Sequence, residues 1–281
     1  MKHIHAVKKG ITSAVLIVAC GFNFSAHADQ LSDIKAKGEL VCGVLGTDEP
    51  FSFIGDPSTR QIVGYDVDLC QAVADKIGVK ASVKQLAVAA RIPELQQGRV
   101  DLLAATLTHT KEREELIDFS VSTFVGGAKI MTKRSSGIEH ISQLAGKRVV
   151  TVKGTTMEQN IRDAVPDAQI ISFDTAPQAL LALKQGKGVA FVNDESTLVK
   201  SMASLGDEGS KFVILSENLS TEYIALGVRK NEPAMKGLVD DVLLDLEKSG
   251  KAEQLFMKWF GPDTKMKYAS RPFKIESSSI N

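Results

Sequence analysis

The chain has 281 residues, and its 34 lysine and arginine side chains are balanced by 34 aspartate and glutamate side chains. A formal charge of zero argues against nucleic acid or an anionic membrane as the main partner. Apolar residues make up 43% of the chain, enough to fill one large core or two modest ones.

The first 28 residues read as a secretory signal peptide. Lys2, Lys8 and Lys9 precede an apolar segment over 11–24, and the small residues of Ala26-His27-Ala28 stand at the expected cleavage site. No later segment has about 18 consecutive apolar residues, the length that a membrane span needs. We therefore expect a mature protein that is released into the periplasm.

The three cysteines leave two questions open. The sequence Ile17-Val18-Ala19-Cys20 also resembles a lipobox, in which Cys20 would carry a lipid anchor. After removal of the signal, Cys42 and Cys70 remain, an even pair in an oxidising compartment. They fit a disulfide or two buried thiols equally well.

Strand and helix patterns alternate along the first half of the mature chain. In chain order we expect a strand over 40–44, a helix capped by Asp66 and closed by Gly78, a strand over 79–86, a short helix over 92–97, and a strand over 100–105. This order predicts an α/β fold with a mostly parallel sheet and helices on both faces.

The second half repeats this organisation. We expect strands over 148–152, 170–173, 189–192 and 222–228, and helices ending near 164, over 177–185 and over 233–249. A helix that ends at glycine before a strand occurs at 95–100 and again at 183–188, which suggests two similar lobes. From about Pro262 the chain turns polar, and we expect a tail that packs on the surface or is partly disordered.

The segment 100–124 holds groups suited to a carboxylate. Thr106 and Thr108 lie two apart, so their side chains point to one side of an extended strand. Thr110 can cap a helix whose free N–H groups attract an anion. Arg113 then adds a planar charged group that can donate two parallel hydrogen bonds. These residues predict an anion site at the end of a strand.

Two other positions follow predicted strands. Gly154, Thr155 and Thr156 form a turn into a helix, where N–H groups also favour an anion. Asp194 follows the strand over 189–192, at the edge of the sheet where ligands bind in open α/β folds. Taken alone, Asp194 would more often be a helix cap, and the turn at Gly154, Thr155 and Thr156 has a simple helix cap as its alternative.

The sequence Thr106-Leu107-Thr108-His109-Thr110-Lys111-Glu112-Arg113, followed by Asp118-Phe119-Ser120, resembles the signature of the polar amino-acid-binding proteins of bacterial ABC importers. The resemblance extends over nearly the whole chain after residue 30. It implies the type II periplasmic binding protein fold, in which two lobes are joined by a two-segment hinge. Lobe 1 would comprise 29–124 with 226–262, lobe 2 would comprise 125–225, and 263–281 would be the tail.

The resemblance also implies roles for single residues. Arg113 and Thr108 would hold the ligand carboxylate, with Thr106 contributing more through its main chain than its hydroxyl. Thr155 and Thr156 would complete that site from the opposite lobe. Asp194 would pair with the ligand ammonium once the lobes close.

Arg91 is the residue that the resemblance connects with ligand choice. It stands in an Arg-x-Pro-x-Leu pattern that family members specific for glutamate or aspartate share, so we expect an acidic amino acid, with glutamine or asparagine as the alternative. Asp48 and Ala87 replace aromatic residues of basic-amino-acid relatives. Phe51 and Phe53 are candidates for the pocket wall, with core packing the favoured role.

The expected mechanism is capture by lobe closure, followed by delivery to a membrane permease. We expect a monomer without cofactor or metal. The same fold resembles secreted cyclohexadienyl dehydratases, but an enzyme needs an acid or base aimed at its substrate, and only His109 lies beside the pocket motif. A sensory module is the other alternative; no membrane span follows Val228, so the chain could at most present its ligand to a separate receptor.

Overall fold

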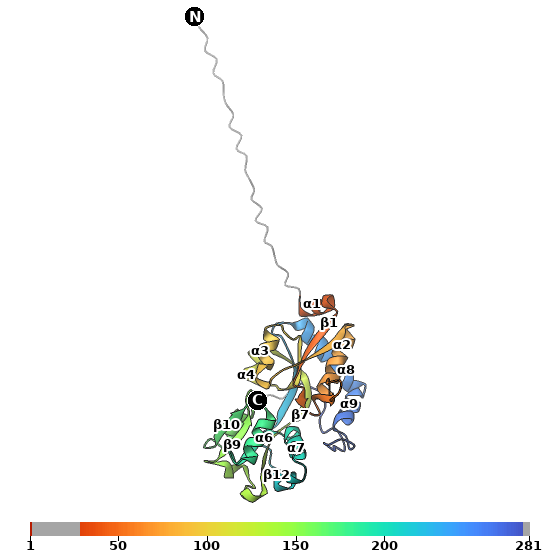
Figure 1. The fold of residues 1–281 in the computed structure, drawn as a ribbon. Helices are drawn as coiled ribbons and strands as arrows, with labels where there is room; N and C mark the ends of the chain where they lie inside the picture. The colour runs from red at the N-terminus through yellow and green to blue at the C-terminus, as the bar shows by residue number, and fades with distance from the viewer. Residues whose placement is uncertain (2–28, 278–281) are drawn as a thin grey trace.

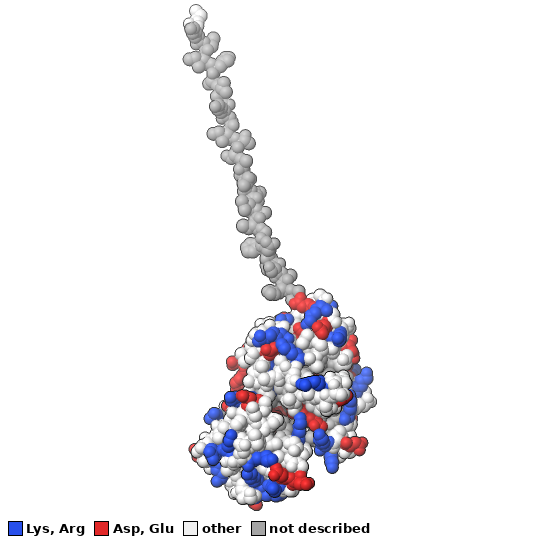
Figure 2. Space-filling view, viewed as in Figure 1, with Lys and Arg blue, Asp and Glu red and all other residues white. Residues whose placement is uncertain are grey.

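The computed structural model describes residue 1 and residues 29–277, which form two β-sheets flanked by helices (Figure 1). The predicted signal peptide and Cys20 fall almost wholly within residues 2–28, outside the described part, and both stay predictions. Among the residues that are described, no helix has the length and hydropathy needed to cross a membrane. Positive and negative side chains are interspersed over the visible face of both lobes (Figure 2).

The first sheet and its helices form lobe 1, with the strand order β5-β1-β6-β13-β7. Its strands are β1 (Glu39–Val44), β5 (Lys80–Gln85), β6 (Leu102–Thr108), β7 (Asp118–Gly126) and β13 (Glu222–Val228). Its helices are α1 (Gln30–Lys37), α2 (Tyr65–Ile77), α3 (Arg91–Gln96), α4 (Lys111–Glu114), α8 (Pro233–Lys248) and α9 (Lys251–Phe260). A small sheet joins β2 (Thr47–Asp48), β3 (Ser52–Asp56) and β4 (Gln61–Val63) beside this lobe.

The second sheet and its helices form lobe 2, with the strand order β10-β9-β11-β8-β12. Its strands are β8 (Ala128–Lys133), β9 (Arg148–Val152), β10 (Gln169–Phe173), β11 (Ala190–Asp194) and β12 (Phe212–Ile214). Its helices are α5 (Met157–Ala164), α6 (Ala176–Lys184) and α7 (Glu195–Ala203). The two-lobed α/β architecture is therefore confirmed.

The sheets are mostly parallel in strand direction, as expected, and in each sheet one strand runs opposite to the other four. β1 runs parallel to β5 and β6, but β13 runs antiparallel to β6 and β7. Likewise, β9 runs parallel to β10 and β11, whereas β8 runs antiparallel to β11 and β12. The antiparallel pairs arise because strands that pass from one lobe to the other enter each sheet from the opposite end.

Two segments connect the lobes and lie against each other. One is the turn between β7 and β8, and the other precedes β13. Ala128 N–H donates to Ser220 Oγ at 3.3 Å, and Leu219 N–H donates to Ala128 O at 2.8 Å. A Cβ at Gly127 would lie 2.5 Å from Ser220 O, so this close approach requires glycine. The predicted lobe boundaries fell after 124 and 225, whereas β7 continues to Gly126 and β13 begins at Glu222.

The predicted helix caps met different outcomes. Thr110 caps α4, because its hydroxyl accepts from the N–H of Arg113 at 3.3 Å. The cap predicted at Asp66 is wrong, since α2 already begins at Tyr65 after Gly64. Asp66 instead accepts from Thr106 N–H at 3.0 Å. The Asp66 carboxylate at the start of α2 thus accepts a hydrogen bond from β6 instead of capping its own helix.

A disulfide answers one open question. Cys42 on β1 and Cys70 on α2 are bonded, with Cα atoms 6.4 Å apart. Both residues are fully buried in the lobe 1 core. The bond therefore fastens α2 to β1 of the lobe 1 sheet.

Aromatic side chains dominate the lobe 1 core. Phe51 packs edge to face on Phe124 and Phe260, with centroids 5.0 and 5.2 Å apart, and is 1% exposed. Phe53 packs on Trp259 at 5.8 Å. Core packing is confirmed for Phe51, and Phe53 also has an aromatic partner outside the predicted pocket.

The tail packs on lobe 1 as far as residue 277. Arg271 donates two hydrogen bonds of 2.7 Å to the carboxylate of Glu247 on α8. Ser122 N–H donates to Glu276 O at 2.7 Å, which adds the tail to the edge of β7. Of the two predicted behaviours, surface packing is confirmed for these residues.

Candidate functional site

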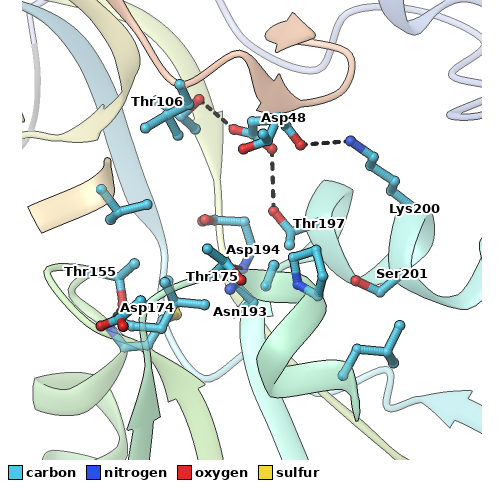
Figure 3. A pocket seen from close by; sticks show the side chains of 18 of the residues that line it. Asp48, Thr106, Thr155, Asp174, Thr175, Asn193, Asp194, Thr197, Lys200 and Ser201 are labelled. Carbon is cyan, nitrogen blue, oxygen red and sulfur yellow. Dashed lines mark hydrogen bonds between the residues drawn. The ribbon is translucent and has the colours of Figure 1, made fainter. Parts of the chain in front are cut away.

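A cavity of about 720 Å³ is lined by residues of both lobes (Figure 3). All seven residues predicted to bind a ligand line it: Arg91, Thr106, Thr108 and Arg113 from lobe 1, and Thr155, Thr156 and Asp194 from lobe 2. The cavity lies at the carboxyl ends of β6, β9 and β11. Ligands bind at this edge in open α/β sheets, because successive loops diverge there.

The lobes are in hydrogen-bond contact across the cavity. Lys200 Nζ on α7 donates to Thr47 O at 2.6 Å, and Figure 3 shows Lys200 pointing toward the segment at Asp48. The guanidinium groups of Arg91 and Arg113 both donate to the carbonyl of Gly154, at 2.9 and 3.1 Å. The lobes therefore stand in a closed arrangement.

Arg113 lies on α4 with its guanidinium at the cavity wall. Nη1 donates to Thr108 O at 2.7 Å and Nη2 to Gly154 O at 3.1 Å. Its other N–H groups donate to no residue within 29–277, so they are free to receive an anion. Burial lowers the pKa of Arg113 below its ordinary value. Arginine side chains nevertheless stay charged in proteins.

Asp194 ends β11 and faces the same cavity from the other lobe. Burial raises the pKa of its carboxyl well above the ordinary value, and the charges of Glu222 and Asp48 raise it further. The carboxylate accepts no hydrogen bond from another residue of the described chain. A carboxyl group in this environment gains most from a cation that arrives from outside.

The Thr108 and Thr156 hydroxyls differ from expectation. Both donate at 2.5 Å to the carboxylate of Glu222, Thr108 to Oε2 and Thr156 to Oε1. Since a hydroxyl has one proton, neither can donate to a ligand while it serves Glu222. Asn160 Nδ2 also donates to Oε1 at 2.6 Å. Sequence reasoning missed Glu222, although a charge at the first position of an apolar strand was a visible signal.

Thr106 is held in an uncommon backbone conformation, with φ at +48°. Its hydroxyl donates to Asp48 Oδ2 at 2.7 Å, and its N–H donates to Asp66. Its carbonyl accepts from Arg91 Nη1 at 3.0 Å. Its main chain and its hydroxyl thus both have protein partners, and the expectation that its main chain contributes more to a ligand than its hydroxyl stays a prediction.

The turn at Thr155 and Thr156 keeps its N–H groups available. The Thr155 hydroxyl donates to Val152 O at 2.7 Å and accepts from Met157 N–H at 3.3 Å. The main-chain N–H groups of Thr155 and Thr156 donate to none of the residues that the structure describes. These two groups precede α5, where the helix dipole favours an anion.

Arg91 is 4% exposed and is bound mainly by main-chain carbonyls. Nε donates to Val88 O, Nη1 to Ala105 O and Thr106 O, and Nη2 to Gly154 O, all between 2.9 and 3.0 Å. Four of its five N–H groups are thereby used. Burial and the charge of Arg113 lower the pKa of Arg91 to about 9. The predicted grip on a ligand side-chain carboxylate therefore lacks the paired donors that it requires.

Two carboxyls, half-buried Asp48 and buried Asp66, accept hydrogen bonds from Thr106. Burial raises the pKa of Asp48 above its ordinary value and raises the pKa of Asp66 to about 7, where the charge of Asp48 contributes. Asp48 lines the cavity, and Thr197 of lobe 2 contacts its Oδ1 at 3.4 Å. The part of the cavity beside Arg91 thus contains the carboxyl of Asp48 as well as a guanidinium.

The comparisons with known proteins agree with this geometry. A model of the family described as bacterial extracellular solute-binding proteins, family 3, matches residues 40–262. The glutamine-binding protein GlnH of a Bacillus subtilis ABC transporter is 31% identical over 262 residues, covering 89% of this chain and 94% of the relative. An L-glutamate/L-aspartate-binding protein of Pseudomonas aeruginosa is 30% identical over 259 residues, covering 87% of this chain and 85% of that relative.

A solved structure shows the same fold. It is the ancestral amino-acid-binding protein AncCDT-1, a precursor of cyclohexadienyl dehydratase, which superimposes with a TM-score of 0.73 at 29% identity. The alignment covers 82% of this chain and 99% of that one. Because the family match includes both lobes and every predicted site residue, the chain belongs to family 3 of the bacterial extracellular solute-binding proteins.

Proposed function

We propose that this protein captures an L-amino acid with an uncharged polar side chain in the periplasm and delivers it to the permease of an ABC importer. The observation that carries the proposal is the placement of Arg113 and Asp194 on opposite lobes, both lining one cavity. An α-amino acid carries one positive and one negative group on neighbouring atoms. Such a zwitterion matches two opposite charges that meet only when the lobes close.

The α-carboxylate belongs at Arg113 in this proposal. Free guanidinium N–H groups there, together with the unused N–H groups of Thr155 and Thr156, form an anion site with donors from both lobes. The α-ammonium belongs at Asp194. The ion pair would offset the solvation free energy that the carboxylate lost when it left water. The ligand thus adds favourable contacts that exist only in the closed state, which is what drives closure.

The side-chain class follows from Arg91 and Asp48. Arg91 has a single N–H left, so it cannot bind a carboxylate bidentately. Asp48 lines the same cavity, and Gln85 and Ser201 add neutral polar groups. An amide fits best, because it can donate to Asp48 and accept from a neutral donor. This replaces the preference for glutamate or aspartate with the glutamine class that the sequence kept as its alternative.

Calorimetry on protein stripped of bound ligand by unfolding and refolding tests the proposal. Across a panel of L-amino acids, we expect glutamine or another neutral polar amino acid to bind with about micromolar affinity, or about −8 kcal/mol. Glutamate should bind at least tenfold more weakly. Tighter binding of glutamate would restore the acidic assignment, and tighter binding of arginine would mean that the charge of Asp48 selects the ligand.

Arg113→Ala provides the matching loss of function. Removal of one partner of a buried charged hydrogen bond costs about 2 to 5 kcal/mol, which would bring a micromolar affinity to roughly millimolar. Arg99→Ala is the control, because Arg99 forms a half-exposed ion pair with Glu94 on lobe 1 and does not line the cavity. Unchanged affinity in Arg113→Ala would refute the site assignment.

The dehydratase alternative requires an acid or base that faces the substrate. His109 does not line the cavity; its Nε2 is 2.6 Å from Glu114 Oε1, and its ring stacks on Phe119. We therefore expect no turnover of prephenate or arogenate by the purified protein. Turnover that Arg113→Ala abolishes would favour the enzyme.

A further inference from the structure

Glu222 stands at the point where the second connecting segment enters lobe 1. It is the first residue of β13 and is 4% exposed. Its carboxylate is held by side chains from both lobes and from the connecting segment itself. Thr108 of lobe 1 donates to Oε2, whereas Thr156 and Asn160 of lobe 2 donate to Oε1.

The division of these contacts is informative. Each carboxylate oxygen serves one lobe, so both oxygens are fully used only when the lobes are in the closed arrangement. Ser220 in the connecting segment adds a 3.3 Å hydrogen bond to Oε1 and also accepts from the N–H of Ala128, the first residue of β8. A single buried carboxylate thus joins both lobes and the connecting segment that precedes β13.

Burial of a carboxylate is unfavourable unless charged or hydrogen-bonded partners compensate. For Glu222 the compensation comes from four donors, and opening would remove the lobe 2 donors from a group that stays with β13. Hydrogen bonds to a charged group are worth about twice those between neutral groups. Opening is therefore opposed by Glu222 itself.

We propose that Glu222 is a positioning residue that stabilises the closed arrangement by holding the Thr108 and Thr156 hydroxyls, one from each lobe. It has a second consequence for binding. Because these hydroxyl protons are used, the ligand carboxylate is received by N–H groups alone. This part of the inference rests on the proposed function, whereas the effect on closure does not.

The test measures closure without any ligand. Spin labels on cysteines introduced at the exposed positions Lys80 in lobe 1 and Lys187 in lobe 2 report the distance between the lobes by electron-electron resonance. In refolded protein we expect Glu222→Ala to lower the ratio of closed to open molecules about tenfold or more. Glu222→Gln, which keeps one acceptor oxygen for lobe 2, should retain most of the closed population.

Glu217→Ala is the matched control. Glu217 also accepts two hydrogen bonds, from His140 and from Ile141 N–H, but all three residues belong to lobe 2. Its loss should leave the distance distribution unchanged. Circular dichroism of each variant at the labelling temperature confirms that the chains compared are folded.

A combined variant tests whether Glu222 acts through the two hydroxyls. In a Thr108→Val, Thr156→Val and Asn160→Ala background, in which the second lobe 2 donor is also removed, adding Glu222→Ala should change the closed fraction no further. An unchanged distance distribution in Glu222→Ala would overturn the proposal. An equal effect of Glu222→Gln would also overturn it, because the acceptor oxygen that glutamine keeps for lobe 2 would then contribute nothing to closure.

Discussion

Arg91 on lobe 1 donates a 2.9 Å hydrogen bond to the carbonyl of Gly154 on lobe 2, 63 residues away. The contact requires the lobes to approach closely at Gly154. A Cβ built at Gly154 would lie 2.8 Å from the Cα of Ala89, and the residue has φ at +76°. Glycine at this turn therefore permits closure, besides permitting the turn itself.

Gly154→Ala should shift the protein toward the open arrangement and weaken ligand binding by about tenfold or more, because the added methyl meets lobe 1 backbone only when the lobes are closed. Gly146→Ala is the control, since Gly146 has a similar φ of +69° but open space around its Cβ. Both variants should lose similar stability from backbone strain. Calorimetry and the interlobe distance should show weaker binding and opening for Gly154→Ala only. Equal ligand affinities of the two variants would contradict the role of Gly154.

Ligand affinity should fall as the pH is lowered. The fall should begin at a pH above about 4, the ordinary pKa of an aspartate. Burial raises the pKa of Asp194, and an ammonium binds only its ionised form, so protons compete with the ligand. Asp194→Asn should bind more weakly at neutral pH and lose this dependence. Calorimetry between pH 4 and 8 measures it. Loss of the dependence in Asp48→Asn instead would place the ammonium elsewhere.

Asp66→Asn should stabilise the protein, more at pH 8 than at pH 5. The folded pKa of Asp66 is about 7, above its ordinary value of 3.8, so its contribution is fully present below pH 4 and is lost as the pH rises through 7. The shift corresponds to about 4 kcal/mol at most. Asparagine can still accept from Thr106 N–H. Urea unfolding at both pH values measures the free energy of unfolding, with Asp75→Asn on the same helix as the control. If Asp66→Asn raised this free energy by the same amount at pH 5 and pH 8, the burial of Asp66 would not matter.

Reduction of the Cys42–Cys70 disulfide should lower the free energy of unfolding by about 3 to 4 kcal/mol, because the bond closes a loop across a separation of 28 residues. Denaturant unfolding with and without a phosphine reductant measures the loss. The Cys42→Ala and Cys70→Ala double variant should not respond to the reductant. A wild-type protein that is equally insensitive would mean that the bond does not form in solution.

The parts of the site that sequence could predict are local. Thr110 and Arg113 lie within one helical turn, so spacing alone placed the cap and the guanidinium together. Glu222 could not be found in this way, because its partners Thr108 and Thr156 lie 114 and 66 residues away. Hydrogen bonds across such separations leave no periodic pattern.

Arg91 illustrates a different limit. Its motif placed it correctly at the cavity, but its partners are main-chain carbonyls, which every residue type carries. Sequence therefore cannot distinguish an arginine that is available to a ligand from one that fastens the backbone. Sequence likewise did not identify β13 and β8 as the strands that run opposite to the others in their sheets, since strand direction depends on which lobe the chain has just left.

The pairing of Arg113 and Asp194 with the two charged ends of one ligand is tested most directly by calorimetry with three forms of the same amino acid. For glutamine, its N-acetyl form and its α-carboxamide, we expect wild-type protein to bind only the first tightly. Arg113→Ala should lose its discrimination against the carboxamide, and Asp194→Asn should lose its discrimination against the N-acetyl form. Wild-type protein that binds all three forms equally would contradict the account.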